Sequence, residues 1–159
     1  VGRGPAPFTG LRVGIAAARM VSEAAHCPLF GVVSLDAIAF AALDAGTGAA
    51  DRPLLVTADA RRKEVYWALY SGRSRSGAPV RAAGPGVLKP EALHEHLAGL
   101  GFSDYSTTEL PIGAADLARV AEAHLLEGIA DSDVSALYLR EPDAALPKPA
   151  AAIGKRVSG

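Results

Sequence analysis

The sequence predicts an α/β fold. Short apolar runs alternate with helix-like patterns between residues 1 and 46. Two further apolar runs, at 54–58 and 65–70, flank a charged turn, which is typical of a hairpin. The chain has 159 residues, half of them hydrophobic, so it is long enough to bury one substantial core. Together these observations favour mixed sheets flanked by helices.

The first elements are a strand end at Val1-Gly2, a stiff loop and a long helix. Pro5 and Pro7 hold the backbone extended and remove amide donors, so the helix begins at or just after Phe8 and runs to about residue 25. At about 100° per residue, one face of this helix carries small residues and the opposite side carries charge. The small face consists of Gly10, Gly14, Ala17, Val21, Ala24 and Ala25, and the charged side of Arg12, Arg19 and Glu23.

The two glycines of this helix need a reason, because a glycine in a helix interior costs about 1 kcal/mol relative to alanine. Close approach of another backbone is the usual one. Two interpretations stay open: the small face packs on the sheet of its own domain, or it meets a second protein. For the helix taken alone, packing within the domain is favoured.

A strand and a second helix are predicted next. The apolar run 28–33 is typical of a buried parallel strand. Ser34 is expected to cap the following helix, with Asp36 in its first turn and Gly46 at its end. Residues 47–52 form a small-residue loop.

The hairpin strand 65–70 has two apolar faces. One face carries Val65, Trp67 and Leu69, and the other carries Tyr66, Ala68 and Tyr70. Neither is strongly polar, so both are expected to be covered. The Gly, Ser and Arg-rich stretch 71–79 is interpreted as a loop.

A third helix is predicted from Pro90 to Gly99 or Gly101. His94 and His96 lie on different sides of it, which is a poor arrangement for one metal ion. The segment 102–111 is interpreted as irregular.

A fourth helix is predicted over 114–126, followed by an extended segment at 134–140 and a loose tail at 144–159. Gly128 is expected to end this fourth helix. The residues expected to face inward are Leu117, Val120, Ala121 and Leu125.

Charge and cysteine content narrow the function classes. Sixteen basic and seventeen acidic residues give a net charge of −1, so the chain offers no broad positive surface for nucleic acid. The single cysteine, Cys27, excludes an internal disulfide and is expected to be a buried thiol in a reducing compartment. Neither a membrane-length apolar segment nor a secretion signal is found in the sequence, so a soluble, cytoplasmic protein is expected.

Familiar catalytic patterns are missing from the sequence. It contains no metal-ligand cluster, nucleophile elbow or phosphate-binding loop with lysine. A glycine-rich turn before a helix can hold an anion through its amides, but Pro5 and Pro7 remove two of those amides. Asp59 follows a strand, as a phosphate or metal role requires, yet Arg61 and the two basic residues after it favour an ion-pairing role in the turn.

Four blocks of the sequence resemble the bacterial TsaB (YeaZ) family, the glycoprotease-like subunit of the tRNA threonylcarbamoyladenosine machinery. The most specific block is the hallmark loop Gly4-Pro5-Ala6-Pro7-Phe8-Thr9-Gly10-Leu11-Arg12-Val13-Gly14, which is similar to the family's G-P-G-S-F-T-G-L-R-[IV]-G. The others are 31–37, 59–66 and 138–144. Ala6 and Pro7 depart from the family's glycine and serine. The family's N-terminal hairpin and first helix are absent, so the chain is expected to be N-terminally truncated, with an incomplete N-terminal lobe.

The resemblance implies an actin-like (ASKHA, RNase H-like) fold of two related lobes. Residues 1–46 are then expected to be the remainder of the N-terminal lobe and 53–143 the C-terminal lobe. The resemblance also implies a non-catalytic subunit that pairs with the catalytic paralogue TsaD and works with the ATPase TsaE. The metal-binding His-x-x-x-His pair of TsaD corresponds here to Leu35 and Ala39, neither of which can ligate a metal.

The resemblance assigns the partner interface to the first helix. The residues concerned are Phe8, Thr9, Gly10, Leu11, Gly14, Ala17, Ala18 and Val21. It implies no cofactor on this chain alone, ATP or ADP only in the complex, and tRNA contact only through the complex. No membrane contact is expected, and a homodimer in isolation stays open beside the heterodimer. The alternatives are an M22-type metallo-glycopeptidase, an actin-like kinase, and a homodimeric interaction domain unrelated to tRNA.

Overall fold

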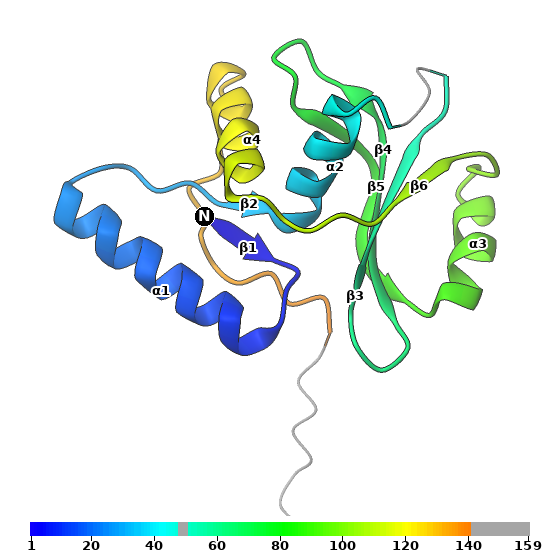
Figure 1. The fold of residues 1–159 in the computed structure, drawn as a ribbon, viewed down its shortest axis with the longest axis horizontal. Helices are drawn as coiled ribbons and strands as arrows, with labels where there is room; N and C mark the ends of the chain where they lie inside the picture. Colours follow the sequence, from blue (N-terminus) through cyan, green and yellow to red (C-terminus); the bar gives the residue numbers. More distant parts are fainter. Residues whose placement is uncertain (48–50, 141–159) are drawn as a thin grey trace, which may run out of the picture.

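The computed structural model describes residues 1–47 and 51–140, and it confirms a mixed α/β architecture with two sheets (Figure 1). β1 (Gly2–Gly4) and β2 (Val32–Val33) form a parallel pair. The larger sheet has the strand order β5-β4-β3-β6. Its strands are β3 (Leu54–Asp59), β4 (Val65–Arg73), β5 (Pro79–Leu88) and β6 (Ser106–Thr108). The helices are α1 (Phe8–Ala25), α2 (Ser34–Asp44), α3 (Pro90–Gly99) and α4 (Ala114–Leu126).

Both faces of the larger sheet are covered, as the two apolar faces of β4 predict. On one face, Tyr70 of β4 belongs to a buried cluster with Leu35 and Ile38 of α2. On the other, Trp67 of β4 is in a buried cluster with Leu97 of α3. The sheet therefore lies between α2 and α3, as Figure 1 shows.

α4 packs on α2 and β2. Val32 of β2, Phe40 of α2 and Val120 of α4 form a third buried cluster. The prediction that Leu125 faces inward is wrong, because its side chain is 49% exposed. Leu125 lies about 140° from Val120 around the helix axis, which turns it away from α2.

The segment 131–140 returns alongside the start of the chain. The amide of Leu137 donates to the carbonyl of Arg3 at 2.7 Å. The Arg3 guanidinium pairs with Asp131 and, at 3.0 Å, with Asp133. The segment predicted as extended is thus attached to β1 by single contacts and forms no strand of its own. The division into 1–46 and 53–143 stays a prediction, and α4 and this segment contact elements of the first range.

Three details before α2 differ from the predictions. The strand expected over 28–33 covers only Val32–Val33, because the three-residue β1 supplies partners for these two residues alone. Ser34 is the first residue of α2 and does not cap it, since Val33 holds the cap position. Cys27 is exposed rather than buried. His26, in the left-handed conformation, ends α1 and leaves the thiol in the turn that follows.

β5 is the main element that the sequence prediction misses. The stretch 71–79, interpreted as a loop, contains the end of β4 and the start of β5. The sequence does not predict β5 because this strand contains Gly84 and Gly86, and glycines are typical of turns. Glycine is needed there, since a Cβ at Gly86 would lie 2.7 Å from the indole nitrogen of Trp67. The segment 102–111, interpreted as irregular, contains β6, which pairs in parallel with β3.

A buried polar network fixes α2 against the larger sheet. The carboxylate oxygens of Asp36 accept hydrogen bonds from the Arg81 guanidinium at 2.6 and 2.7 Å, and Oδ1 also accepts one from the Tyr70 hydroxyl at 2.7 Å. Burial acts to lower the pKa of Arg81, but the charge of Asp36 outweighs it and the pKa is raised. Burial, followed by the charge of Asp36, raises the pKa of Tyr70 well above its ordinary value, so Tyr70 stays a neutral donor.

Some predictions concern residues outside the described ranges. The tail expected at 144–159 is one, as are residues 48–50 of the expected loop. Among the described residues, none of the helices combines the length and hydropathy that crossing a membrane requires.

The Asp36–Arg81 pair yields a stability prediction. Arg81→Met leaves the Asp36 carboxylate buried without its cation, and we expect the free energy of unfolding to fall by about 3 kcal/mol. Urea denaturation followed by circular dichroism measures this. The double variant Asp36→Asn/Arg81→Met recovers part of the loss, because no unpaired charge remains.

The matched control for this prediction is Arg52→Met. Arg52 forms an exposed pair with Asp104 at 3.3 Å, and losing such a pair costs less than about 1 kcal/mol. Equal losses in Arg81→Met and Arg52→Met would contradict a stabilising role for the buried network.

Candidate functional site

The hallmark loop positions the start of α1. Gly4 has a φ of +104°, and a Cβ there would lie 3.0 Å from the Leu11 side chain and 3.1 Å from the carbonyl oxygen of Leu137, so only glycine fits. Pro7 precedes the helix and Phe8 is its first residue, as predicted. The loop therefore determines where α1 leaves β1.

α1 contacts the rest of the protein along one narrow side. Leu11 and Ile15 are its buried residues, each 7% exposed. In Figure 1 the helix lies at one edge of the molecule, beside β1. Nothing lies within 4 Å of a Cβ built at Gly10 or at Gly14. The interpretation that the small-residue face packs on its own sheet is therefore wrong, because the helix turns Leu11 and Ile15 inward and its glycines outward.

The outward side of α1 is an apolar surface, which we call the α1 face. It consists of Gly10, Val13, Gly14, Ala17, Met20 and Val21, all exposed. The side chains of Met20 and Val21 are 74% and 64% exposed, so most of their apolar area faces solvent. Adjoining exposed apolar side chains of this kind are typical of docking sites.

The predicted interface residues are divided by the structure. Those that are exposed are Phe8, Thr9, Gly10, Gly14, Ala17 and Val21. Ala18 is half-buried, and Leu11 faces the protein interior. The Leu11 side chain therefore packs inside the protein and is not accessible to a partner. Val13 and Met20, which are not among the predicted interface residues, extend the exposed surface.

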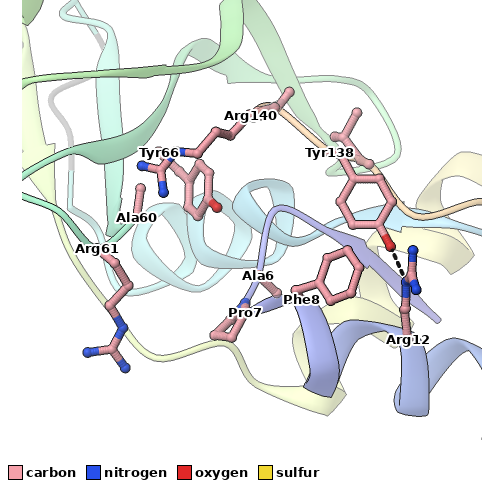
Figure 2. Close-up of a pocket in the computed structure, with 11 residues that line it drawn as sticks. Ala6, Pro7, Phe8, Arg12, Ala60, Arg61, Tyr66, Tyr138 and Arg140 are labelled. Atoms are coloured by element: carbon pink, nitrogen blue, oxygen red, sulfur yellow. Dashed lines mark hydrogen bonds between the residues drawn. The ribbon is translucent and has the colours of Figure 1, made fainter. Parts of the chain in front are cut away.

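A cavity of about 580 Å³ lies beside the first turn of α1 (Figure 2). Residues 6–12, the β3–β4 turn at 60–66 and the segment 137–140 enclose it. Arg12, Arg61 and Arg140 line it together with aromatic rings, and none of its lining residues in the described part of the chain is acidic. The arrangement is suited to an anion that also carries an apolar or aromatic group.

Side chains at one end of the cavity are stacked. The rings of Phe8 and Tyr138 are stacked with centroids 5.3 Å apart. The Arg12 guanidinium lies 3.9 Å from the Phe8 ring centroid, and its Nε donates to the Tyr138 hydroxyl at 2.7 Å. At the other end, Arg140 pairs with Glu64. Figure 2 shows the Arg140 guanidinium near Tyr66, apart from Phe8 and Tyr138.

Sequence reasoning places Phe8 and Arg12 in the hallmark loop but assigns no binding role to Tyr66, Tyr138 and Arg140, which also line the cavity. A signal for them was present in the blocks that carry the family resemblance. Three of the four, 4–14, 59–66 and 138–144, contribute residues to this cavity. Because these three blocks lie far apart in the sequence, the sequence alone does not show that they border one cavity.

Asp59 has the turn role that the sequence favours. Its Oδ1 accepts a hydrogen bond from the amide of Arg61 at 2.7 Å, and Oδ2 lies 3.6 Å from the Arg61 guanidinium. Arg61, Arg62 and Lys63 all adopt positive φ angles in this turn. No group of three or more metal-ligating side chains occurs within residues 1–47 and 51–140. A phosphate or metal role for Asp59 stays an untested alternative.

Comparisons with known proteins identify relatives of the chain. Residues 1–135 match the model of the family described as TsaD, tRNA N6-adenosine threonylcarbamoyltransferase. An uncharacterised protein of Mycobacterium leprae is 41% identical over 150 residues, covering 91% of this chain and 38% of that protein. The tRNA threonylcarbamoyladenosine biosynthesis protein TsaB of Escherichia coli is 41% identical over 96 residues, covering 60% of this chain and 40% of that protein. The chain thus spans less than two thirds of the curated relatives it matches.

A solved structure shows the same fold. YeaZ from Pseudomonas aeruginosa superposes with a TM-score of 0.67 at 24% identity, covering 87% of this chain and 72% of that one. The fold that the family resemblance implies is confirmed by this likeness and by the family match.

Two substitutions in α1 separate its inward and outward sides. We expect Gly14→Ala to raise the free energy of unfolding by about 1 kcal/mol, because the added methyl group has open space and alanine favours the helix. Leu11→Ala lowers it by about 3 kcal/mol, because it opens a gap in a buried site. Urea denaturation of the purified chain measures both. A destabilising Gly14→Ala would contradict the outward placement of the glycines.

Proposed function

The chain belongs to the family of the tRNA N6-adenosine threonylcarbamoyltransferase TsaD and, within it, to the TsaB (YeaZ) proteins, and we propose that it is a non-catalytic partner subunit in tRNA threonylcarbamoyladenosine synthesis. The observation that carries the proposal is the α1 face, an apolar helix surface that has no partner within the described residues. The partner is a TsaD-like catalytic subunit.

The composition of the α1 face supports contact with another helix. Gly10, Gly14 and Ala17 permit close approach of a second backbone, while Val13 and Met20 supply apolar area around them. The charged residues of α1 do not interrupt this surface. Arg12, Arg19 and Glu23 lie about 180–220° from Gly10 around the helix axis, close to the side that contacts the protein.

The buried side of α2 supports a non-catalytic role for this chain. Leu35 and Ala39, which correspond to the metal-binding histidines of TsaD, are buried in the cluster between α2 and the larger sheet. Their aliphatic side chains provide no ligand atoms. In the proposal, the TsaD-like subunit transfers threonylcarbamoyl from its adenylate to adenosine, a TsaE-like ATPase works with the pair, and ATP, ADP and tRNA are engaged only in that cytoplasmic complex.

A charged substitution on the α1 face tests the pairing. We expect Gly14→Glu to weaken binding of the cognate TsaD by about a hundredfold or more, because an unpaired carboxylate buried at the interface costs at least ~3 kcal/mol. Isothermal titration calorimetry measures the affinity. The matched control is Leu126→Glu, at an exposed apolar position on α4, which should leave the affinity unchanged.

Other outcomes of this experiment bear on the alternatives. Unchanged TsaD binding by Gly14→Glu would refute the interface assignment. Self-association that Gly14→Glu abolishes, with no TsaD binding by the parent chain, would favour a homodimeric interaction domain.

A second experiment tests the role in cells. In cells depleted of the endogenous protein, we expect the unaltered protein to restore tRNA modification and its Gly14→Glu variant not to.

A further inference from the structure

We propose that the cavity beside the first turn of α1 binds a nucleotide, that is, an aromatic base carrying a 5′-phosphate. The proposal goes beyond the partner role and does not depend on it, because Phe8 is the one predicted interface residue that lines the cavity and no residue of the α1 face does. It also departs from the expectation that this chain alone binds no nucleotide.

The cavity has the size of a small-molecule site. Its volume of about 580 Å³ falls within the range of roughly 300–1,000 Å³ that is typical of ligand pockets. Its walls come from three separate segments, so a ligand would touch the start of α1, the β3–β4 turn and residues 137–140 together. Most of the lining is apolar, with a few polar groups converging on it.

Exposed aromatic rings provide a surface for a base. Phe8 is 50% and Tyr138 44% exposed, although they are stacked on each other. Tyr66 lines the opposite wall, and in Figure 2 its ring points into the space between the two sides. Stacking of a base on such rings contributes about 1–3 kcal/mol to binding. An aliphatic anion would not use these rings.

The charge of the lining selects an anion. Among the described residues Arg12 forms no ion pair, since its contacts are the Phe8 ring and the Tyr138 hydroxyl. Arg61 is highly exposed and only 3.6 Å from Asp59, a weak pair that a phosphate can replace. Guanidinium groups bind phosphate through paired hydrogen bonds. Arg140 is already paired with Glu64, so Arg12 and Arg61 are the groups left to meet a ligand. Because no carboxylate lines the cavity in the described part of the chain, a metal cation is disfavoured and a phosphate favoured.

The first turn of α1, where Pro7 and Phe8 line the cavity, carries further donors. The helix has no side-chain cap and no acidic residue in its first turn. The amides of Phe8, Thr9 and Gly10 have no acceptor within the helix, because they precede its first internal hydrogen bond, from Leu11 to Pro7. Pro5 and Pro7 remove amides before the helix but leave these three. Together with the arginines, they form an environment that attracts negative charge.

Calorimetric titration of the purified chain with AMP tests the proposal. We expect saturable binding of AMP and binding of adenosine at least about tenfold weaker, because adenosine lacks the group that the arginines contact. A single-stranded pentanucleotide RNA, used as a second ligand, distinguishes the source of the nucleotide. Tighter binding of the RNA identifies a nucleotide within a strand, and tighter binding of AMP identifies a free nucleotide.

Variants locate the binding to the cavity. Arg61→Gln and Tyr138→Ala change exposed side chains and should each weaken AMP binding at least about fivefold. Arg52→Gln, at an exposed arginine away from the cavity, is the control and should bind AMP like the parent chain. Arg12→Lys keeps a charge but loses the guanidinium plane, so it should also bind AMP more weakly.

Several outcomes would overturn the proposal. These are the lack of saturable AMP binding up to ~1 mM, equal affinities for AMP and adenosine, and AMP binding that Arg61→Gln and Tyr138→Ala leave unchanged. Gly14→Glu, which tests the partner role, should retain AMP binding. Failure of one proposal is thereby distinguished from failure of the other.

Discussion

The fold depends on the anchoring of α2 by the buried pair of Asp36 and Arg81. Eight of the eleven residues of α2 are buried, among them Asp36 itself. A carboxylate in such a place is stabilised only where a cation and hydrogen-bond donors meet it, and Arg81 of β5 and Tyr70 of β4 do so. Because Phe40 of the same helix packs with β2 and α4, α2 joins the larger sheet to the β1–β2 pair.

Most of α2 is buried, whereas α1 is buried along one narrow side only. α1 therefore has one side that contacts the protein and one that is exposed. Leu11 and Ile15 attach α1 to the protein, so the opposite side is left to solvent with its glycines uncovered. That exposed side is the basis of the proposed partner role. The N-terminal end of the same helix borders the arginine and tyrosine-lined cavity, so one element presents an apolar surface for a protein and a polar one for an anion.

The cavity exists only because the chain returns to its starting point. Residues 137–140 lie beside residues 6–12 since Leu137 bonds to Arg3 and Arg3 pairs with Asp131 and Asp133. The β3–β4 turn closes the third side, and its Glu64 pairs with Arg140. Long-range polar contacts thus hold together groups that are 76 residues apart, for Glu64 and Arg140, and 128 apart, for Arg3 and Asp131.

The sequence by itself determined the features that are set locally. Prolines and glycines mark where α1, α3 and α4 begin or end, and the two apolar faces of β4 require cover on both sides, so helix positions, the β3–β4 hairpin and the hallmark loop could be predicted. The tertiary structure alone decided that Leu11 turns inward, that Cys27 is exposed, that β5 uses glycines to accommodate Trp67, and that Arg12, Tyr138 and Arg61 border one cavity. The exposure of Cys27 follows from the turn at His26. The other features depend on contacts between residues distant in the chain, and periodicity and spacing within one segment carry no information about such contacts.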